Sequence, residues 1–236
     1  MVKKFNLDEI FENSSETTKL IILDIDSTLV TTYQRNQAIL NLFCKEMRED
    51  YPEESQRLSR AQCQLGDYGY FTALERLSVP PQDPVFMAEL QNFWRKHFFS
   101  NEFLHEDVPA PGAVDFVNRI SNEKIPFVYL TGRYKESMWE GTLSSLKHRG
   151  FPINEEILIL KEDLSLSDGL YKSMAIKRLK DKYKDHQLWI IDNEPVILNQ
   201  TLKDHPDVQL VWFESCHSGR EEPPESVRTI QDFKYL

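Results

Sequence analysis

Five short apolar runs, rich in β-branched and aromatic residues, most strongly limit how this chain of 236 residues can fold. Their length is typical of strands that are buried on both faces of a sheet. They cover residues 20–23, 126–130, 157–160, 188–191 and 208–213. Helical periodicity separates the last four runs, at residues 113–120, 136–148, 172–183 and 195–202. Strands that alternate with helices predict an α/β fold with a doubly wound parallel sheet of five or more strands.

About eighty residues between Thr28 and Gly112 show no convincing strand pattern and contain helical stretches at residues 38–47, 54–64 and 87–99. This block predicts a helical lobe inserted after the first strand. We therefore divide the chain into a core domain, residues 1–30 and 106–236, and a helical cap, residues 31–105. The final stretch from residue 215 onward is rich in charge and proline, and we interpret it as a solvated surface segment.

Three features of the cap leave a choice between packing and substrate contact. An apolar stripe at helical spacing is typical of a lobe interior, which is our interpretation, and stacking on a substrate is the alternative. The stripe consists of Leu90, Phe93, Trp94, Phe98 and Phe99. The glycine turn that carries Tyr68 and Tyr70 is interpreted as a helix connection, although such turns also reach ligands. Arg35, at the entrance to the lobe, either contacts substrate or lies on the surface.

Charge and cysteine content narrow the classes of partner. A formal net charge of −10 and a pI near 5.2 argue against nucleic acid and against an anionic membrane surface. Cys44, Cys63 and Cys216 have no Cys-x-x-Cys spacing and indicate neither a disulfide framework nor a zinc site. Apolar runs are too short to span a membrane. We expect a cytoplasmic protein with no membrane and no nucleic-acid partner, and the sequence leaves the oligomeric state open.

The first apolar run ends in two acidic residues, Asp24 and Asp26, which are followed by Thr28. If the chain stays extended, both carboxylates face the same side. Two like charges at short distance need a cation or a shared proton between them. The structural alternative is that these residues only end the strand and supply turn hydrogen bonds. Open α/β sheets bind ligands beyond the carboxyl ends of their strands, which is where this pair lies.

The second run ends in Thr131, Gly132 and Arg133, directly before a helical pattern. A hydroxyl, a glycine that allows close backbone approach and the N–H groups of a helix start all suit an oxyanion. The structural alternative is a capping threonine followed by a turn glycine. Arg133 faces either the site or the solvent.

Another run ends in Asp192 and Asn193, which serve either a site or the N-terminal cap of the next helix. Lys172 lies at the predicted start of the helix before this run, where a cation is unfavourable unless it faces an anion. With Lys177 and Lys180 nearby, Lys172 is our choice for a phosphate-facing lysine, and surface solvation is the alternative.

Taken in order, these groups resemble the four motifs of the haloacid dehalogenase superfamily, whose aspartate-based phosphatases form its largest group. Asp24 to Thr28 match the first motif, Thr131 the second with its common Thr-Gly-Arg ending, Lys172 the third and Asp192 the fourth. The resemblance covers nearly the whole chain in layout. It implies a Rossmann-like core domain and a helical cap of the C1 type.

The resemblance implies that Asp24 attacks the phosphorus of a monoester and forms an aspartyl-phosphate, which water then hydrolyses. Asp26 is implied to protonate the leaving oxygen and later to accept a proton from water, and for this role we expect its pKa to be raised relative to that of Asp24. Thr131, the Gly132 amide and Lys172 are implied to hold the phosphoryl oxygens.

The resemblance also implies Mg²⁺, held by the side chains of Asp24 and Asp192 and by the backbone carbonyl of Asp26. Many relatives carry a second acid near the fourth motif, and here Asn193 or Glu194 is the candidate outer ligand. We therefore predict a magnesium-dependent phosphomonoester hydrolase. A cap that closes over the site favours a small phosphorylated metabolite as substrate.

Two alternatives remain on the same core. A phosphomutase or other phosphotransferase returns the phosphoryl group to a substrate, and a regulatory domain binds phosphate without turnover. A dehalogenase needs neither a leaving-group acid nor a metal, so Asp26 and Asp192 favour phosphoryl transfer over that third activity of the superfamily.

Overall fold

The computed structural model describes residues 3–12, 18–225 and 227–234. Within these residues the main element is a seven-stranded sheet with all strands parallel, in the order β1-β9-β8-β7-β2-β5-β6. Its strands are β1 (Lys3–Lys4), β2 (Thr18–Leu23), β5 (Phe127–Tyr134), β6 (Leu158–Lys161), β7 (His186–Asp192), β8 (Gln209–Phe213) and β9 (Arg228–Ile230). The predicted α/β fold with a parallel sheet is confirmed.

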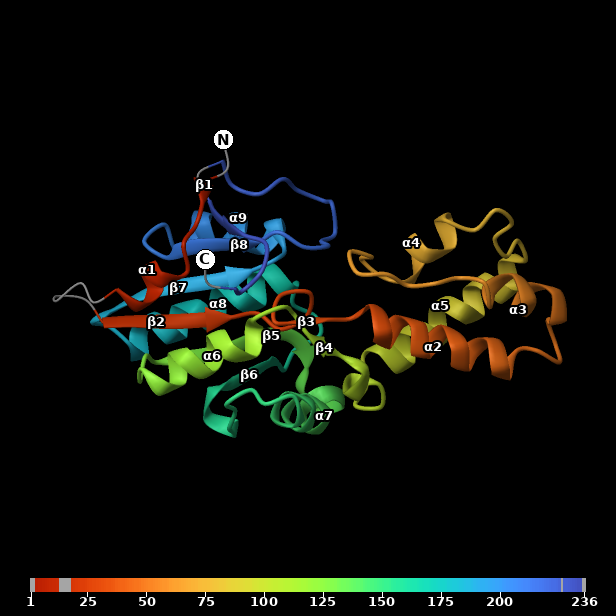
Figure 1. Cartoon of the computed structure of the whole chain (residues 1–236), viewed down its shortest axis with the longest axis horizontal. Coiled ribbons are helices and arrows are strands. Elements are labelled where there is room, and N and C mark those ends of the chain that lie inside the picture. The colour runs from red at the N-terminus through yellow and green to blue at the C-terminus, as the bar shows by residue number, and fades with distance from the viewer. Residues whose placement is uncertain (1–2, 13–17, 226, 235–236) are drawn as a thin grey trace.

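Helices cover both faces of this sheet (Figure 1). One face carries α1 (Asp8–Phe11), α6 (Ala113–Asn122) and α7 (Lys135–His148), and the other carries α8 (Asp168–Lys182) and α9 (Pro195–Asp204). Two 3₁₀ turns, η1 (Leu104–Glu106) and η2 (Glu155–Ile157), lie in connections. The helices predicted over residues 113–120, 136–148 and 195–202 are confirmed to within a few residues.

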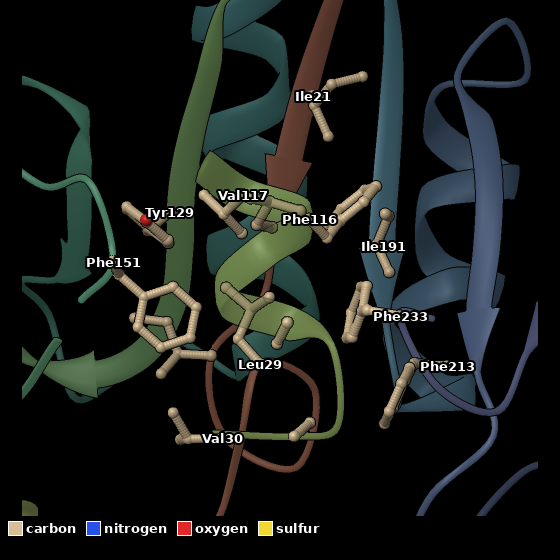
Figure 2. Packing of buried hydrophobic residues seen from close by; sticks show 14 of the residues in the cluster. Ile21, Leu29, Val30, Phe116, Val117, Tyr129, Phe151, Ile191, Phe213 and Phe233 are labelled. Carbon is tan, nitrogen blue, oxygen red and sulfur yellow. The ribbon is translucent and has the colours of Figure 1, made fainter. Parts of the chain in front are cut away.

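Strand β2 is apolar at every position from Leu20 to Leu23 because it is buried on both faces. Ile21 and Leu23 belong to the hydrophobic cluster under α6, and Leu20 and Ile22 belong to the cluster under α8 and α9. Figure 2 shows Phe116 on α6 packed among side chains of the first cluster. β2 therefore packs on both sides of the sheet, and it lies between β5 and β7.

Two strands of the sheet were not predicted. β1 and β9 pair with each other at one edge, and β9 lies in the stretch that we interpreted as a solvated surface segment. That interpretation is wrong for residues 228–230, where Thr229 and Ile230 are buried. A strand of three residues is too short to show a period in the sequence.

The predicted helical insertion is present. It contains α2 (Tyr33–Glu46), α3 (Pro52–Leu58), α4 (Tyr70–Glu75) and α5 (Pro84–Phe98), which enclose their own hydrophobic cluster around Phe43, Tyr70 and Phe86. Figure 1 shows this group set apart from the sheet. α3 ends earlier than predicted, and α4 was not predicted. The domain limits themselves stay a prediction.

A two-stranded antiparallel ribbon lies where the chain enters and leaves the helical insertion. β3 (Val30–Thr31) pairs with β4 (Val108–Pro109), although the sequence indicated no strand there. The ribbon brings the first residues of α2 next to the segment that returns to the sheet. None of the described helices is both long and apolar enough to cross a membrane.

Candidate active site

A cavity of about 540 Å³ lies beyond the carboxyl ends of β2, β5 and β7 and extends to the helical insertion. It brings together all of the candidate site residues: Asp24, Asp26, Thr131, Gly132, Arg133, Lys172, Asp192, Asn193 and Glu194. The strand ends meet here because β2 lies between β5 and β7 in the sheet. Ligand sites of open α/β sheets occupy this position.

The loop after β2 is a tight turn rather than a continued strand. The carbonyl of Ile25 accepts hydrogen bonds from the N–H groups of Thr28, Leu29 and Val30. Ser27 adopts a left-handed backbone with φ of 60°, a conformation that costs energy in a residue other than glycine. The turn, and not an extended backbone, directs both carboxylates of the first motif into the cavity.

Asp24, Lys172 and Asp192 form one buried group, which we call the lysine cluster. Lys172 Nζ donates to Asp24 Oδ1 and to Asp192 Oδ2, each at 2.6 Å. Thr28 Oγ1 donates to Asp24 Oδ2 at 2.8 Å, and the Glu194 N–H donates to Asp192 Oδ1 at 2.9 Å. The three cluster side chains are at most 8 % exposed, so two carboxylates share a single ammonium group away from water.

This arrangement shifts the titration of the cluster. Burial raises the pKa of Asp24 to about 7, and the nearby Asp192 acts in the same direction, although Lys172 opposes both. Burial alone would lower the pKa of Lys172, but the two carboxylates outweigh it and raise that pKa. Lys172 is therefore charged, and the protonation of Asp24 depends on what else enters the cavity.

Asp26 belongs to a second group, which we call the arginine network: Asp26, Arg35, Asp107 and Arg133. Arg133 Nε donates to Asp26 Oδ2 at 2.7 Å, and its second terminal nitrogen reaches both Asp26 Oδ1 at 2.8 Å and Asp107 Oδ2 at 2.7 Å. Arg35 donates to Asp26 Oδ1 and bonds both oxygens of Asp107, at 2.8 and 2.9 Å. Two carboxylates thus alternate with two guanidinium groups.

The expectation that the pKa of Asp26 is raised relative to that of Asp24 is wrong. Burial acts to raise it, but the guanidinium groups of Arg133 and Arg35 outweigh burial and hold the pKa well below its usual range. The prediction considered only the repulsion from Asp24. Arg133 faces the site rather than the solvent, and Arg35 pairs with Asp26 instead of lying on the surface.

The Thr131 region differs from the predicted helix start. β5 continues to Tyr134, and α7 begins only at Lys135, so the N–H groups after Thr131 do not belong to a helix terminus. The pairing of β5 with β6 shifts register between Thr131 and Tyr134. Such a bulge frees backbone groups from the ladder. A Cβ on Gly132 would lie 3.1 Å from the carboxyl carbon of Asp168, which explains why a glycine suits this position.

Lys172 lies one turn inside its helix rather than at the start. α8 begins at Asp168, and the side chain of Ser167 caps it by accepting from the N–H of Leu170. The predicted start at Lys172 is therefore wrong, but its predicted direction into the site is correct. Lys172 is 4 % exposed and points to the lysine cluster, which excludes the surface alternative.

Asn193 and Glu194, the candidate outer ligands, are both engaged with the stretch after β8. Asn193 Nδ2 donates to the carbonyl of Cys216 at 2.6 Å. The carboxylate of Glu194 accepts from the N–H and the hydroxyl of Ser218, at 2.9 and 2.6 Å. Ser215 donates to the carbonyl of Ser27. The stretch that we interpreted as solvated surface therefore borders the site, which the sequence analysis missed.

The donor set of the lysine cluster suits a hard cation. Two buried carboxylates that reach the same ammonium nitrogen lie close together, and oxygen ligands select Mg²⁺ over softer metals. In the described part of the chain, no three His, Cys, Asp or Glu side chains gather as a metal-binding group, because Asp26 turns to the arginines. A cation here would draw on two side chains and on backbone or water oxygens. The predicted magnesium ligands were the side chains of Asp24 and Asp192 and, from Asp26, only the backbone carbonyl. The residues fit this set.

Several residues in or beside the cavity were not predicted from the sequence. Lys161, at the end of β6, pairs with Asp168 at 2.9 Å, and Arg220 lines the same cavity. Asp107, directly before β4, completes the arginine network by accepting hydrogen bonds from Arg35 and Arg133. Each is a common surface residue type, and only the folded chain shows what it contacts.

No family model matches this chain, and no curated protein matches it. Solved structures do match it in fold. CbbY from Rhodobacter sphaeroides has a TM-score of 0.54 at 14% identity, over 92% of this chain and 95% of that one. A haloacid dehalogenase-like hydrolase from Burkholderia xenovorans LB400 gives 0.51 at 14%, over 92% and 94%. One from Bacteroides fragilis gives 0.51 at 15%, over 92% and 98%. The chain has the haloacid dehalogenase-like fold.

The haloacid dehalogenase-like fold extends over the sheet and the helical insertion, since each match covers 92% of this chain. The resemblance carried by the four motifs is thus confirmed for the fold. The C1 type of the cap stays a prediction. Shared fold does not establish shared chemistry.

Proposed function

We propose that the protein is a magnesium-dependent phosphomonoester hydrolase that forms an aspartyl-phosphate on Asp24. The observation that carries this proposal is the convergence of Asp24 and Asp192 on Lys172, within one cavity that also holds Thr131. A buried carboxylate beside a fixed ammonium and a hydroxyl offers a nucleophile and donors for phosphoryl oxygens together.

In the first step an oxygen of Asp24 attacks phosphorus, and the bond from phosphorus to the ester oxygen breaks. Lys172 donates to the transferring phosphoryl oxygens, and Thr131 has a hydroxyl hydrogen to add. The N–H of Arg133 donates to Thr131 Oγ1 at 3.2 Å, which leaves that hydroxyl hydrogen free to turn toward substrate. Positioned donors of this kind supply most of the catalysis in phosphoryl transfer.

Asp26 is the proposed proton carrier. It gives a proton to the ester oxygen in the first step and takes one from water in the second, when the bond from Asp24 to phosphorus breaks. The two arginines fix the orientation of its carboxylate. A bound phosphate dianion adds negative charge beside Asp26 and so raises the pKa that the arginines lower.

Magnesium, held by Asp24, Asp192 and the carbonyl of Asp26, would offset the repulsion between the nucleophilic carboxylate and the phosphate. The fold neighbour CbbY is described in complex with xylulose-1,5-bisphosphate and with phosphate, which supports a small phosphorylated ligand for this cavity as well. The volume of about 540 Å³ suits a small molecule rather than a folded macromolecule.

The test is hydrolysis of p-nitrophenyl phosphate by the wild type, with magnesium and with a chelator, and by Asp24→Asn. We expect release of p-nitrophenol by the wild type with magnesium only, and a loss of at least about 10³-fold in Asp24→Asn. The matched control is Asp115→Asn on α6, an exposed carboxylate away from the cavity, which retains full activity. Undiminished turnover by Asp24→Asn refutes the nucleophile. A wild type that is inactive on every phosphate ester refutes the hydrolase.

A further inference from the structure

The helical insertion presents two exposed aromatic rings to the cavity. Tyr68, in the loop before α4, is 56 % exposed, and Phe99, directly after α5, is 48 % exposed. Both line the same cavity as the lysine cluster. Exposed rings elsewhere on a surface need no explanation, but ring area that opens into a proposed catalytic cavity is available to a bound molecule.

Neighbouring rings of this wall are already occupied by packing. The guanidinium of Arg35 lies 4.3 Å from the ring centre of Phe98, and Phe98 stacks on Trp94 with centroids 4.6 Å apart and planes 26° apart. Phe99 meets both rings edge-to-face, at 5.1 and 5.8 Å. These contacts hold Phe99 in place while about half of it stays exposed. In the described part of the chain Tyr68 contacts no other ring, so most of its ring is available.

The cap side of the cavity is also poor in usable charge. Among the described cavity residues of the insertion, Arg35 alone is charged, and its nitrogens donate to Asp26, Asp107 and the carbonyl of Phe98. The amide oxygen of Asn36 accepts from Trp94 Nε1 at 2.7 Å. A second phosphate would find no free cation on the insertion itself, although Arg220, from the stretch after β8, lines the same cavity and acts on the charge of Tyr68. A flat apolar group would find two rings.

Resting on the proposed function, we propose that the substrate is a phosphomonoester with an aromatic ring in its leaving group, bound against the rings of Tyr68 and Phe99. The phosphate end of the cavity fixes where the ester oxygen lies, and the rest of the molecule extends toward the rings of the insertion. Aromatic pairs prefer offset-stacked or edge-to-face contacts, which give binding beyond apolar burial alone. The interpretation of the whole aromatic stripe as lobe interior is therefore wrong for Phe99, although it is correct for Leu90, which is fully buried.

The test compares benzyl phosphate with cyclohexylmethyl phosphate as substrates of the wild type with magnesium. Both release a primary alcohol of similar size, and only one has a ring with π faces. Any difference in leaving-group reactivity is the same for every variant, so a change of preference between variants reports on the rings alone. We expect kcat/KM to favour benzyl phosphate by about tenfold. Phe99→Leu and Tyr68→Leu each reduce that preference to about twofold, and Phe99→Tyr retains it. Methyl phosphate, which does not reach the rings, is hydrolysed equally by all four proteins.

The matched control is Phe71→Leu, because Phe71 is an exposed ring of the same lobe, 47 % exposed, that does not line the cavity. It retains the wild-type preference. Equal rates on the two esters, or an unchanged preference in Phe99→Leu and Tyr68→Leu, overturn the aromatic site and leave the hydrolase standing. A preference for fructose 1,6-bisphosphate that Arg220→Gln abolishes overturns it in favour of a second phosphate at the rim. Failure to hydrolyse any ester overturns the proposed function itself.

Discussion

The lysine cluster and the arginine network both hold aspartates against cations, but their charges balance differently. The lysine cluster sets two carboxylates against one ammonium, which leaves one negative charge unpaired. The arginine network sets two carboxylates against two guanidinium groups. An unpaired buried charge is costly, whereas the charges of a balanced and bonded group compensate one another, so that removing one partner is strongly destabilising. The network is therefore balanced without a ligand, whereas the cluster has one negative charge that the proposed magnesium would balance.

The two groups also differ in what they join. The lysine cluster lies wholly at the ends of β2 and β7 and on α8, within the sheet and its helices. The arginine network links Arg35 on α2, Asp107 before β4 and Arg133 on β5. Its bonds therefore fix the base of the helical insertion relative to the sheet.

Matched Asp→Asn substitutions test this difference in charge balance most strongly. Asp107→Asn places an amide N–H₂ against the two guanidinium groups, and we expect the free energy of unfolding to fall by about 3 kcal/mol. Asp192→Asn removes one of two like charges around Lys172, so the lost hydrogen bond is offset, and we expect a fall of about 1 kcal/mol or less. Urea unfolding of both variants in chelator measures the two values.

Asp115→Asn is the control for the substitution itself, with an expected change within about 0.5 kcal/mol. Equal losses in Asp107→Asn and Asp192→Asn would contradict the comparison, because both clusters would then behave as balanced groups. A larger loss of unfolding free energy in Asp192→Asn than in Asp107→Asn would mean that the lysine cluster, and not the arginine network, is the balanced group.

Magnesium should stabilise the protein through the lysine cluster and not through the arginine network. A cation that completes the lysine cluster binds only the folded state, and at a hundred times its dissociation constant it stabilises the protein by about 2.7 kcal/mol. We expect this gain in the wild type and in Asp107→Asn, and no gain in Asp24→Asn or Asp192→Asn. Thermal unfolding with and without magnesium measures it. A gain that survives in Asp192→Asn would place the cation elsewhere.

The parts of this molecule that were predictable from the sequence are those with a local signature. Buried parallel strands are apolar at every position, so the runs that become β2, β5 and β7 are visible without a structure. Parallel strands share one carboxyl edge, which is why Asp24 and Asp192 were expected to meet. The helix start at Lys172 was misplaced because Asp168 and Gly169 give little helical periodicity.

The arginine network was not predictable, because its bonds join residues far apart in the chain. Arg35 and Asp107 are separated by 72 positions, and Arg133 and Asp26 by 107. Charged residues are mostly exposed, so nothing local indicates that these four are paired and largely buried. The wrong expectation for the pKa of Asp26 has this cause: the nearest charged residue in the sequence is an acid, Asp24, whereas the charged groups that contact Asp26 in the folded chain are two arginines.

The pH dependence of stability tests the smallest difference between the two groups. Burial and Asp192 raise the pKa of Asp24 to about 7 without metal, above its value of about 4 in the unfolded chain. Between these values the folded state binds more protons at Asp24, so this residue's contribution is largest below pH about 4 and is lost as pH rises toward 7. The lowered pKa of Asp26 acts in the opposite direction, but its contribution is complete above pH about 4 and does not vary in this range.

We therefore expect the stability of the wild type relative to Asp24→Asn to fall between pH 5 and pH 7 in chelator. The slope is at most about 1.4 kcal/mol per pH unit, the value for one full proton. Urea unfolding at each pH measures it. Magnesium should remove the slope, because a carboxylate that binds a cation is ionised throughout the range. A flat difference in chelator would mean that Lys172 alone neutralises the cluster, and the unpaired charge on which the comparison rests would not exist.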